Sequence, residues 1–287
     1  MILAEEEWRA RLAAHEARVD ALVGPHVARR REGQAHPVHD FLFTYYSFKP
    51  AQLRRWHPGR GVVLAGDPPH AAWSGYVRGP DGVRVAPGVA ERRHATIEWV
   101  HALLTATASR PAHTGCFGLH EWAMVYRTRP GQVRHETYPL RLGHDGTDAV
   151  VETHQIRCSH FDAFRFFTAE ARPRNTLAPT RELQPRLEQP GCLHAGMDLY
   201  KWAYKLVPMV PSELVADAFE LAAEIRELDM RASPYDLSGL GYEPVRIETT
   251  EGKREYVERQ RAFAERGAVV RDRLLAVIDR ELAPLHG

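Results

Sequence analysis

Cysteine and histidine occur together at three places in this chain. Each of its three cysteines is followed within four residues by a histidine, and no two cysteines have the spacing of a redox pair or a zinc ribbon. The pairs are Cys116 and His120, Cys158 and His160, and Cys192 and His194. Thiolate and imidazole both bind transition metals of intermediate softness, so the pattern predicts one site gathered from three segments. Buried thiols beside core histidines are the alternative interpretation.

The same segments supply further candidate ligands and acids. The histidines expected to bind the metal are His120, His154, His160 and His194. The carboxylates expected to act in catalysis are Glu121, Asp162 and Asp198. His194 and Asp198 are four residues apart, so on a helix they would share one face. Histidines with carboxylates favour iron or zinc, which predicts a metal-dependent enzyme acting on a small polar or aromatic substrate.

Aromatic and basic residues could form a binding surface. The candidates for base or substrate binding are Tyr45, Tyr46, Trp56, Trp122, Arg157, Lys201 and Trp202. Aromatic residues at such spacings are also typical of a core, so both interpretations remain open. The 38 basic and 37 acidic residues nearly cancel, whereas a duplex-DNA binder usually has a basic excess. DNA, a small molecule and a second subunit therefore all remain possible partners.

The hydrophobic periodicity predicts an α+β fold in which helices dominate. Helical patterns cover residues 4–31, 92–109, 192–206, a segment from 211 and residues 251–285. Hairpin patterns lie near residues 70–90 and 130–157, the second around Gly143-His144-Asp145-Gly146, and a short strand is predicted at 245–248. We expect an N-terminal helical arm over residues 1–33 and one globular domain over 34–287, built around a small, mostly antiparallel sheet.

Several classes of protein are disfavoured by what the sequence lacks. The first residues are acidic rather than basic and apolar, and no run approaches the roughly 18 apolar residues of a membrane span. With three unpaired cysteines, this predicts a cytoplasmic protein without a membrane partner. Walker A, G-x-G-x-x-G, H-E-x-x-H, G-x-S-x-G and zinc-deaminase motifs are absent.

Four long segments carry a resemblance to a known family. They are His36–Gly59, Thr153–Thr168, Pro190–Pro208 and Ile225–Leu237. They resemble a bacterial family, common in actinobacteria, known as 3-methyladenine DNA glycosylases, and the resemblance covers about His36 to Arg259. It implies removal of alkylated bases during DNA repair, in which a flipped, charged base would stack between aromatic rings beside a carboxylate. The sequence does not resemble the characterised glycosylase superfamilies. A binding protein without catalysis is a third interpretation.

Overall fold

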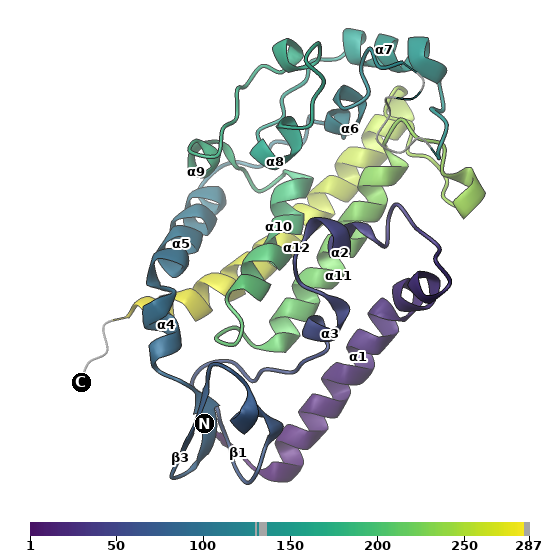
Figure 1. Cartoon of the computed structure of the whole chain (residues 1–287). Coiled ribbons are helices and arrows are strands. Elements are labelled where there is room, and N and C mark those ends of the chain that lie inside the picture. The colour runs from purple at the N-terminus through teal and green to yellow at the C-terminus, as the bar shows by residue number, and fades with distance from the viewer. Residues whose placement is uncertain (130, 132–136, 284–287) are drawn as a thin grey trace. The chain divides into compact units, whose positions relative to one another are not determined.

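The protein is an α+β chain in which helices dominate. The computed structural model describes residues 1–129, 131 and 137–283 (Figure 1). Helices make up most of these residues, together with one small, largely antiparallel sheet, which confirms the predicted fold class. No helix in these ranges is long and apolar enough to cross a membrane. The chain divides into two compact units. Unit 1 comprises Met1–Leu104, Leu199–Glu220 and Val270–Gly287, and unit 2 comprises Thr105–Asp198 and Leu221–Val269.

Unit 1 contains the sheet. Its strands are β1 (Ile2–Leu3), β2 (Val63–Leu64), β3 (Tyr76–Gly79) and β4 (Gly82–Val85), in the spatial order β1-β2-β4-β3. β1 pairs with β2 in parallel, and the other pairs are antiparallel. The β3–β4 pair confirms the hairpin predicted near residues 70–90. Gly82 has φ 134°, and a Cβ there would lie 2.2 Å from the carbonyl oxygen of Leu64, so only glycine fits.

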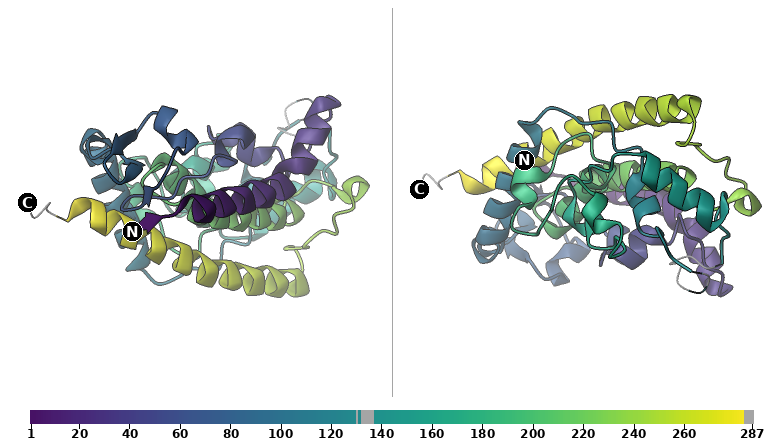
Figure 2. Two further views of the ribbon diagram at one scale, coloured as in Figure 1. Left: turned by 90° about the horizontal axis from the view of Figure 1, so that it is seen from below. Right: turned by 90° about the horizontal axis from the view of Figure 1, so that it is seen from above.

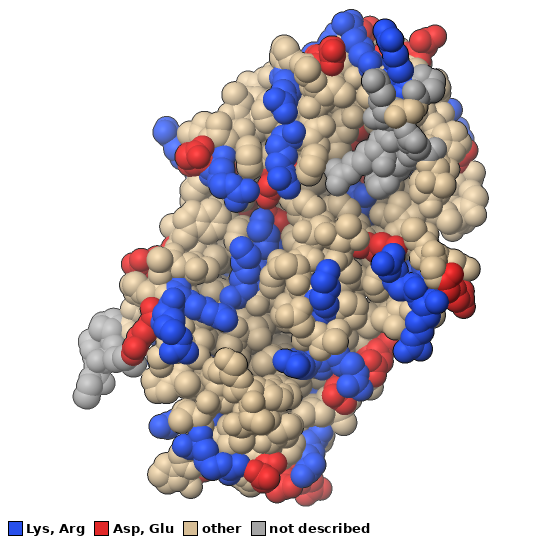
Figure 3. All heavy atoms as spheres, viewed as in Figure 1, with Lys and Arg blue, Asp and Glu red and all other residues tan. Residues whose placement is uncertain are grey.

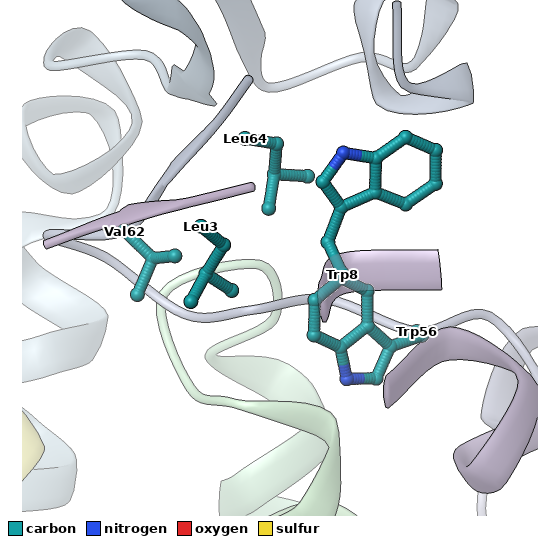
Figure 4. Close-up of a cluster of buried hydrophobic side chains, with 5 residues drawn as sticks. All are labelled: Leu3, Trp8, Trp56, Val62 and Leu64. Carbon is teal, nitrogen blue, oxygen red and sulfur yellow. The ribbon is translucent and has the colours of Figure 1, made fainter. Parts of the chain in front are cut away.

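A small hydrophobic cluster fixes the sheet to the first helix. Leu3, Trp8, Trp56, Val62 and Leu64 pack together and are nearly inaccessible to solvent (Figure 4). Burial of such side chains stabilises unit 1 by roughly 1.5–3 kcal/mol each. The Trp8 indole is also satisfied, because its Nε1 donates to the carbonyl of residue 65 at 2.9 Å.

The predicted N-terminal helix is α1 (Glu5–Arg31). Three glutamates in its first turn and three arginines in its last turn favour the helix dipole. The helix changes direction near its C-terminal end, where Pro25 interrupts the backbone hydrogen bonds (Figures 1 and 2). Short helices α2 (Phe41–Tyr45), α3 (Pro50–Leu53), η1 (Pro69–Ala72) and α4 (Gly88–Arg92) complete this part of the chain. The division into units does not fall at residue 33, where the predicted arm ends.

Unit 2 combines short helices with irregular segments. The short helices are α6 (Leu119–Ala123), α7 (Gly143–Thr153), α8 (Phe161–Phe164), η2 (Arg172–Arg174), α9 (Gln184–Leu187) and η3 (Ser238–Leu240). Four longer helices have residues in both units: α5 (His94–Ala108), α10 (Leu193–Lys205), α11 (Ser212–Arg231) and α12 (Thr250–Leu282). These four confirm the predicted helical segments, and Figure 2 shows α12 as one continuous ribbon.

The hairpin predicted around Gly143-His144-Asp145-Gly146 is wrong, because these residues begin helix α7. Gly143 enters the helix at φ 63°, and the Thr147 hydroxyl donates back to the Gly143 carbonyl at 2.7 Å. Thr147, Val150 and Val151 recur at helical spacing and are buried, so tertiary burial overrides the β-preference of this valine-rich run. Residues 130 and 132–136 of the predicted sheet lie outside the described residues.

The strand predicted at residues 245–248 is also wrong. Val245 and Ile247 are both fully buried, which explains the alternating pattern. Their backbone amides, however, bond to the carbonyls of Arg231 and Val245 rather than to a neighbouring strand. Alternation of apolar residues therefore marks a buried loop here.

Candidate metal centre

Three helices bring two imidazoles and one carboxylate together in unit 2. His120 lies in α6, His194 is the second residue of α10, and Asp229 lies near the end of α11. One donor atom from each side chain lies within 4.8 Å of the other two, so the group could hold a metal ion. His120 Nε2 is 2.8 Å from Asp229 Oδ1, and the two imidazole rings meet edge to face with centroids 4.4 Å apart. All three side chains are buried.

His120 and Asp229 form a short ion pair whose atoms lack good hydrogen-bond geometry. Although the two atoms are close, neither His120 Nε2 nor Asp229 Oδ1 has a hydrogen-bond partner of acceptable geometry among the described residues. Buried polar atoms are nearly always paired, so two facing atoms without that geometry need an explanation. A common cation bound by both atoms would provide it, once His120 has lost the proton that Asp229 stabilises.

The charges of His194 and Asp229 suit metal binding. Burial disfavours the charged form of His120, but the negative charge of Asp229 outweighs burial and raises the pKa of His120. Burial and the neighbouring His120 lower the pKa of His194 well below its usual value, so His194 is neutral and its lone pair is available. Burial opposes ionisation of Asp229, yet His120 and Arg226 hold its pKa below its ordinary value. Metal ligands must be deprotonated, as His194 and Asp229 are.

Arg226 orients the carboxylate. Its Nη1 donates to Asp229 Oδ2 at 2.9 Å and to Glu121 Oε1 at 3.0 Å. Because Arg226 engages Oδ2, the other oxygen of Asp229 is directed toward His120. Hydrogen bonding of this kind fixes the orientation of metal-binding carboxylates. Glu121, predicted as a catalytic residue, therefore lies in a buried ion pair.

A second buried histidine–carboxylate group lies beside the first. The His160 ring centroid is 5.3 Å from that of His194. His160 Nε2 is 3.4 Å from Asp198 Oδ2 and 3.7 Å from Glu188 Oε2. Glu188 is held in turn by Gln184, whose Nε2 donates to it at 2.8 Å. The predicted residues His160 and Asp198 thus contact each other next to the group of three.

All three cysteines meet at one cavity. Its volume is about 20 Å³, and its walls include Cys116, Cys158 and Cys192 as well as His120 and His194. Burial raises the pKa of each thiol, that of Cys158 to about 12, so the thiols are protonated at neutral pH. The three sequence segments that carry the cysteines therefore converge at one cavity in unit 2. Arg157, predicted to bind substrate, also lines this cavity.

Amide side chains position the irregular segments that carry the cysteines. Gln260 Nε2 donates to Cys116 Sγ at 3.1 Å and to the Gly191 carbonyl at 2.6 Å. The Asn175 amide pairs with both backbone groups of Cys158, at 2.7 and 2.9 Å. Backbone groups outside helices and strands need such partners when they are buried. Just before α6, Phe117 and Gly118 both have positive φ, so α6 begins from a strained turn.

Two predicted site residues of unit 2 lie outside this group. His154 follows α7, and its Nδ1 bonds to the Val150 carbonyl at 2.7 Å. Asp162 forms ion pairs with Arg165 at 3.2 Å and Arg181 at 3.7 Å. His154 therefore terminates a helix, and Asp162 balances nearby arginines.

The predicted aromatic residues are dispersed. Tyr46 packs edge to face against Tyr200, and its neighbour Tyr45 stacks on Phe41. Trp202 packs against Trp99 with Lys201 above its ring, at 4.5 Å from the centroid. Trp56 lies in the cluster of Figure 4, and Trp122 is fully buried in unit 2 with its Nε1 donating to the Ala232 carbonyl. Four of these aromatic side chains are buried: Tyr46, Trp56, Trp122 and Trp202.

Asp229 was missed by the sequence analysis, although a signal was present. Helix α11 buries a stripe that includes Ala222 and Ile225, and Asp229 is seven residues after the first and four after the second. A charged residue on the apolar stripe of a helix is rarely buried without a partner, so its position indicated a functional or paired carboxylate.

Comparisons with known proteins found no match to the chain among family models, curated proteins or solved structures.

Proposed function

We propose that unit 2 is the catalytic part of a metal-dependent enzyme that binds Fe(II) or Zn(II) through His120, His194 and Asp229. The observation that carries the proposal is the convergence of the three donor atoms within 4.8 Å. Structural zinc sites usually have four protein ligands, whereas catalytic sites keep a position for water or substrate. Two histidines with one carboxylate are also the ligand set of many non-haem Fe(II) enzymes.

The cavity defines what could react there. A bound metal ion would supply Lewis-acid activation of a coordinated oxygen. The cavity volume of about 20 Å³ accommodates roughly one water molecule beside His120 and His194. The exposed Arg157 at the cavity wall offers a cation to a carbonyl or acidic group of the substrate. These features favour a small polar substrate attacked by water or by a molecule of similar size.

Arg226 would act as a positioning residue in this reaction. Its bond to Asp229 Oδ2 leaves Oδ1 for the ion, and its bond to Glu121 keeps the guanidinium in place. Arg226 also balances the charge of the carboxylates, which limits the cost of burying them.

Excision of alkylated bases, which the resemblance implies, remains a separate prediction. Its stacking candidates are mostly core residues, and the cavity is far below the roughly 300 Å³ of small-molecule sites. In the view of Figure 3, Lys and Arg side chains are spread over the surface, and Asp and Glu lie beside many of them. The geometry therefore favours the metal-dependent enzyme.

Elemental analysis of freshly purified protein without an affinity tag tests the proposal. We expect near-stoichiometric iron or zinc in the wild type. His120→Ala, His194→Ala and Asp229→Asn should each lose the metal while circular dichroism shows a folded chain. His154→Ala is the matched control and should keep it, because His154 bonds to a backbone carbonyl. Full metal content in His194→Ala and Asp229→Asn would contradict the ligand set.

A second measurement separates the two functions. Metal-loaded and metal-free protein would be compared for hydrolysis of nitrophenyl esters, for oxygen uptake with small aromatic acids, and for base release from methylated DNA. Metal-dependent turnover of a small substrate is expected. Base release that is identical with and without metal would instead support the glycosylase and contradict the proposal.

A further inference from the structure

Unit 1 has a pocket of its own. Its volume is about 460 Å³, within the range of roughly 300–1,000 Å³ typical of small-molecule sites. Among the described residues, the cationic side chains that line it are Arg55, Arg93 and Lys205, and no carboxylate lines it. In a chain with a net charge of +1, this local excess of positive charge is unusual.

The three cations differ from Arg54, which precedes Arg55 in the sequence. Neighbouring Arg54 pairs with Glu16 at 2.9 Å and with Asp20 at 2.8 Å. In the described ranges of the chain, by contrast, Arg55, Arg93 and Lys205 form no ion pair with a carboxylate. Like charges that gather without a carboxylate repel each other, and a bound anion would relieve the repulsion.

Local contacts hold the cations in place. Arg93 Nη1 donates to the carbonyl of Lys205 at 3.1 Å and to that of Val207 at 2.5 Å. This fixes one guanidinium beside the end of α10, where Lys205 also lies. The Arg55 guanidinium stacks above the Trp73 ring at 5.6 Å. Part of the positive charge is therefore positioned before any ligand arrives.

Aromatic rings form another part of the wall. Phe48 and Tyr204 both line the pocket, and their rings are stacked with centroids 5.0 Å apart and planes 11° apart. Phe48 is partly exposed, so its ring is available to a ligand. The polar side chains of Ser47, Gln52 and Ser74 add hydrogen-bonding groups. A pocket with cations, polar groups and a ring face suits a ligand that joins an anion to a planar ring.

We propose that this pocket binds a small phosphate monoester that carries an aromatic or heteroaromatic ring. The phosphate would contact Arg55, Arg93 and Lys205, and the ring would lie against Phe48. The pocket is built entirely from unit 1, so the inference goes beyond the proposed metal-dependent function and does not depend on it.

Isothermal titration calorimetry with phenyl phosphate tests the inference on the full chain. We expect saturable binding at one site. Inorganic phosphate, which lacks the ring, should bind more weakly, and phenyl β-glucoside, which lacks the charge, should not bind. The absence of phenyl phosphate binding at millimolar concentrations would overturn the proposal, as would equal binding of the uncharged glucoside.

Variants at adjacent positions provide a matched comparison. Arg55→Gln and Lys205→Gln should each weaken phenyl phosphate binding at least about tenfold, because each removes a charge-assisted hydrogen bond. Arg54→Gln should bind as the wild type does, since Arg54 faces Glu16 and Asp20. Equal affinities in Arg54→Gln, Arg55→Gln and Lys205→Gln would exclude this pocket.

Two further titrations distinguish failure of this proposal from failure of the proposed metal site. The metal-free protein and His194→Ala should bind phenyl phosphate with unchanged affinity, so loss of the metal site would leave this result intact. An oligonucleotide duplex is titrated in parallel. If Arg55→Gln weakens duplex binding but phenyl phosphate does not bind, the pocket serves a nucleic acid and the small-molecule proposal is wrong.

Discussion

The cavity of unit 2 and the pocket of unit 1 satisfy their charged groups in opposite ways. In unit 2, beside the cavity, Asp229 is buried and contacts both His120 and Arg226, which are buried as well. At the pocket, Arg55 and Lys205 are exposed and have no carboxylate partner in the described part of the chain. Buried charges need partners within the protein, whereas exposed cations are stabilised by water until an anion displaces it. The comparison shows why one site suits a metal ion and the other an anionic ligand.

Removal of the central carboxylate should have the largest effect. Asp229→Ala leaves Arg226 and His120 buried without that partner, so the free energy of unfolding of the metal-free protein should fall by about 3–5 kcal/mol. Asp217→Ala is the control on the same helix. Asp217 pairs with Arg18 and Arg273 near the surface, and its loss should cost about 1 kcal/mol or less. Urea unfolding measures the free energy of unfolding of both variants. Equal losses would show that the buried contacts of Asp229 stabilise the protein no more than the ion pairs of Asp217 do.

Removal of an amide that holds the loops should have an intermediate effect. Gln260→Ala deprives the buried Gly191 carbonyl and Cys116 of a donor, so the free energy of unfolding should fall by about 1–3 kcal/mol. Zinc affinity, measured by competition with a chelator, should fall as well, because His194 follows Gly191 by three residues. Gln155→Ala, at an exposed position in unit 2, is the control and should change neither quantity. Unchanged zinc affinity in Gln260→Ala would show that the loops do not position the ligands.

Acidification should act on unit 1 through His57, and near pH 6 its effect should be the smallest of the three. Burial, with the nearby charges of His70, Arg55 and His15, lowers the pKa of His57 to about 3. Its Nδ1 also lies 2.8 Å from the Tyr76 hydroxyl. In the unfolded chain, His57 takes up a proton below about pH 6.5. In the folded protein, it takes up this proton only near pH 3. The contribution of His57 to the free energy of unfolding is therefore fully present above pH 6.5. It is lost as the pH falls toward 3, by at most about 1.4 kcal/mol per pH unit.

His57→Gln isolates this contribution. Urea unfolding between pH 7 and pH 5 should give a flatter dependence on pH in the variant than in the wild type. A parallel pH dependence in the two proteins would show that His57 takes up a proton as readily in the folded protein as in the unfolded chain.

The sequence predicted more of the helices than of the sheet. In α1, α11 and α12 the apolar residues recur with the helical period over several turns, so local pattern and tertiary burial agree. In the Gly143–Thr153 segment they disagree, because Val150 and Val151 favour a strand locally but are buried as part of a helix. The candidate site shows the same division. His120 and His194 follow from the cysteine–histidine spacing, whereas His154 ends a helix and Asp229 comes from a segment without cysteine or histidine.

The sequence by itself determined the α+β class, the long helices and the segments that carry thiols and imidazoles, because these depend on residue type and short-range periodicity. Only the tertiary structure decided which residues meet. Asp229 lies beside His120 and His194, although it follows them by 109 and 35 residues in the sequence. Arg54 and Arg55 are adjacent in the sequence, yet Arg54 faces a pair of carboxylates and Arg55 lines a cationic pocket. Such contacts depend on how helices pack and on where each side chain points, and neither is encoded in the spacing of residues along the chain.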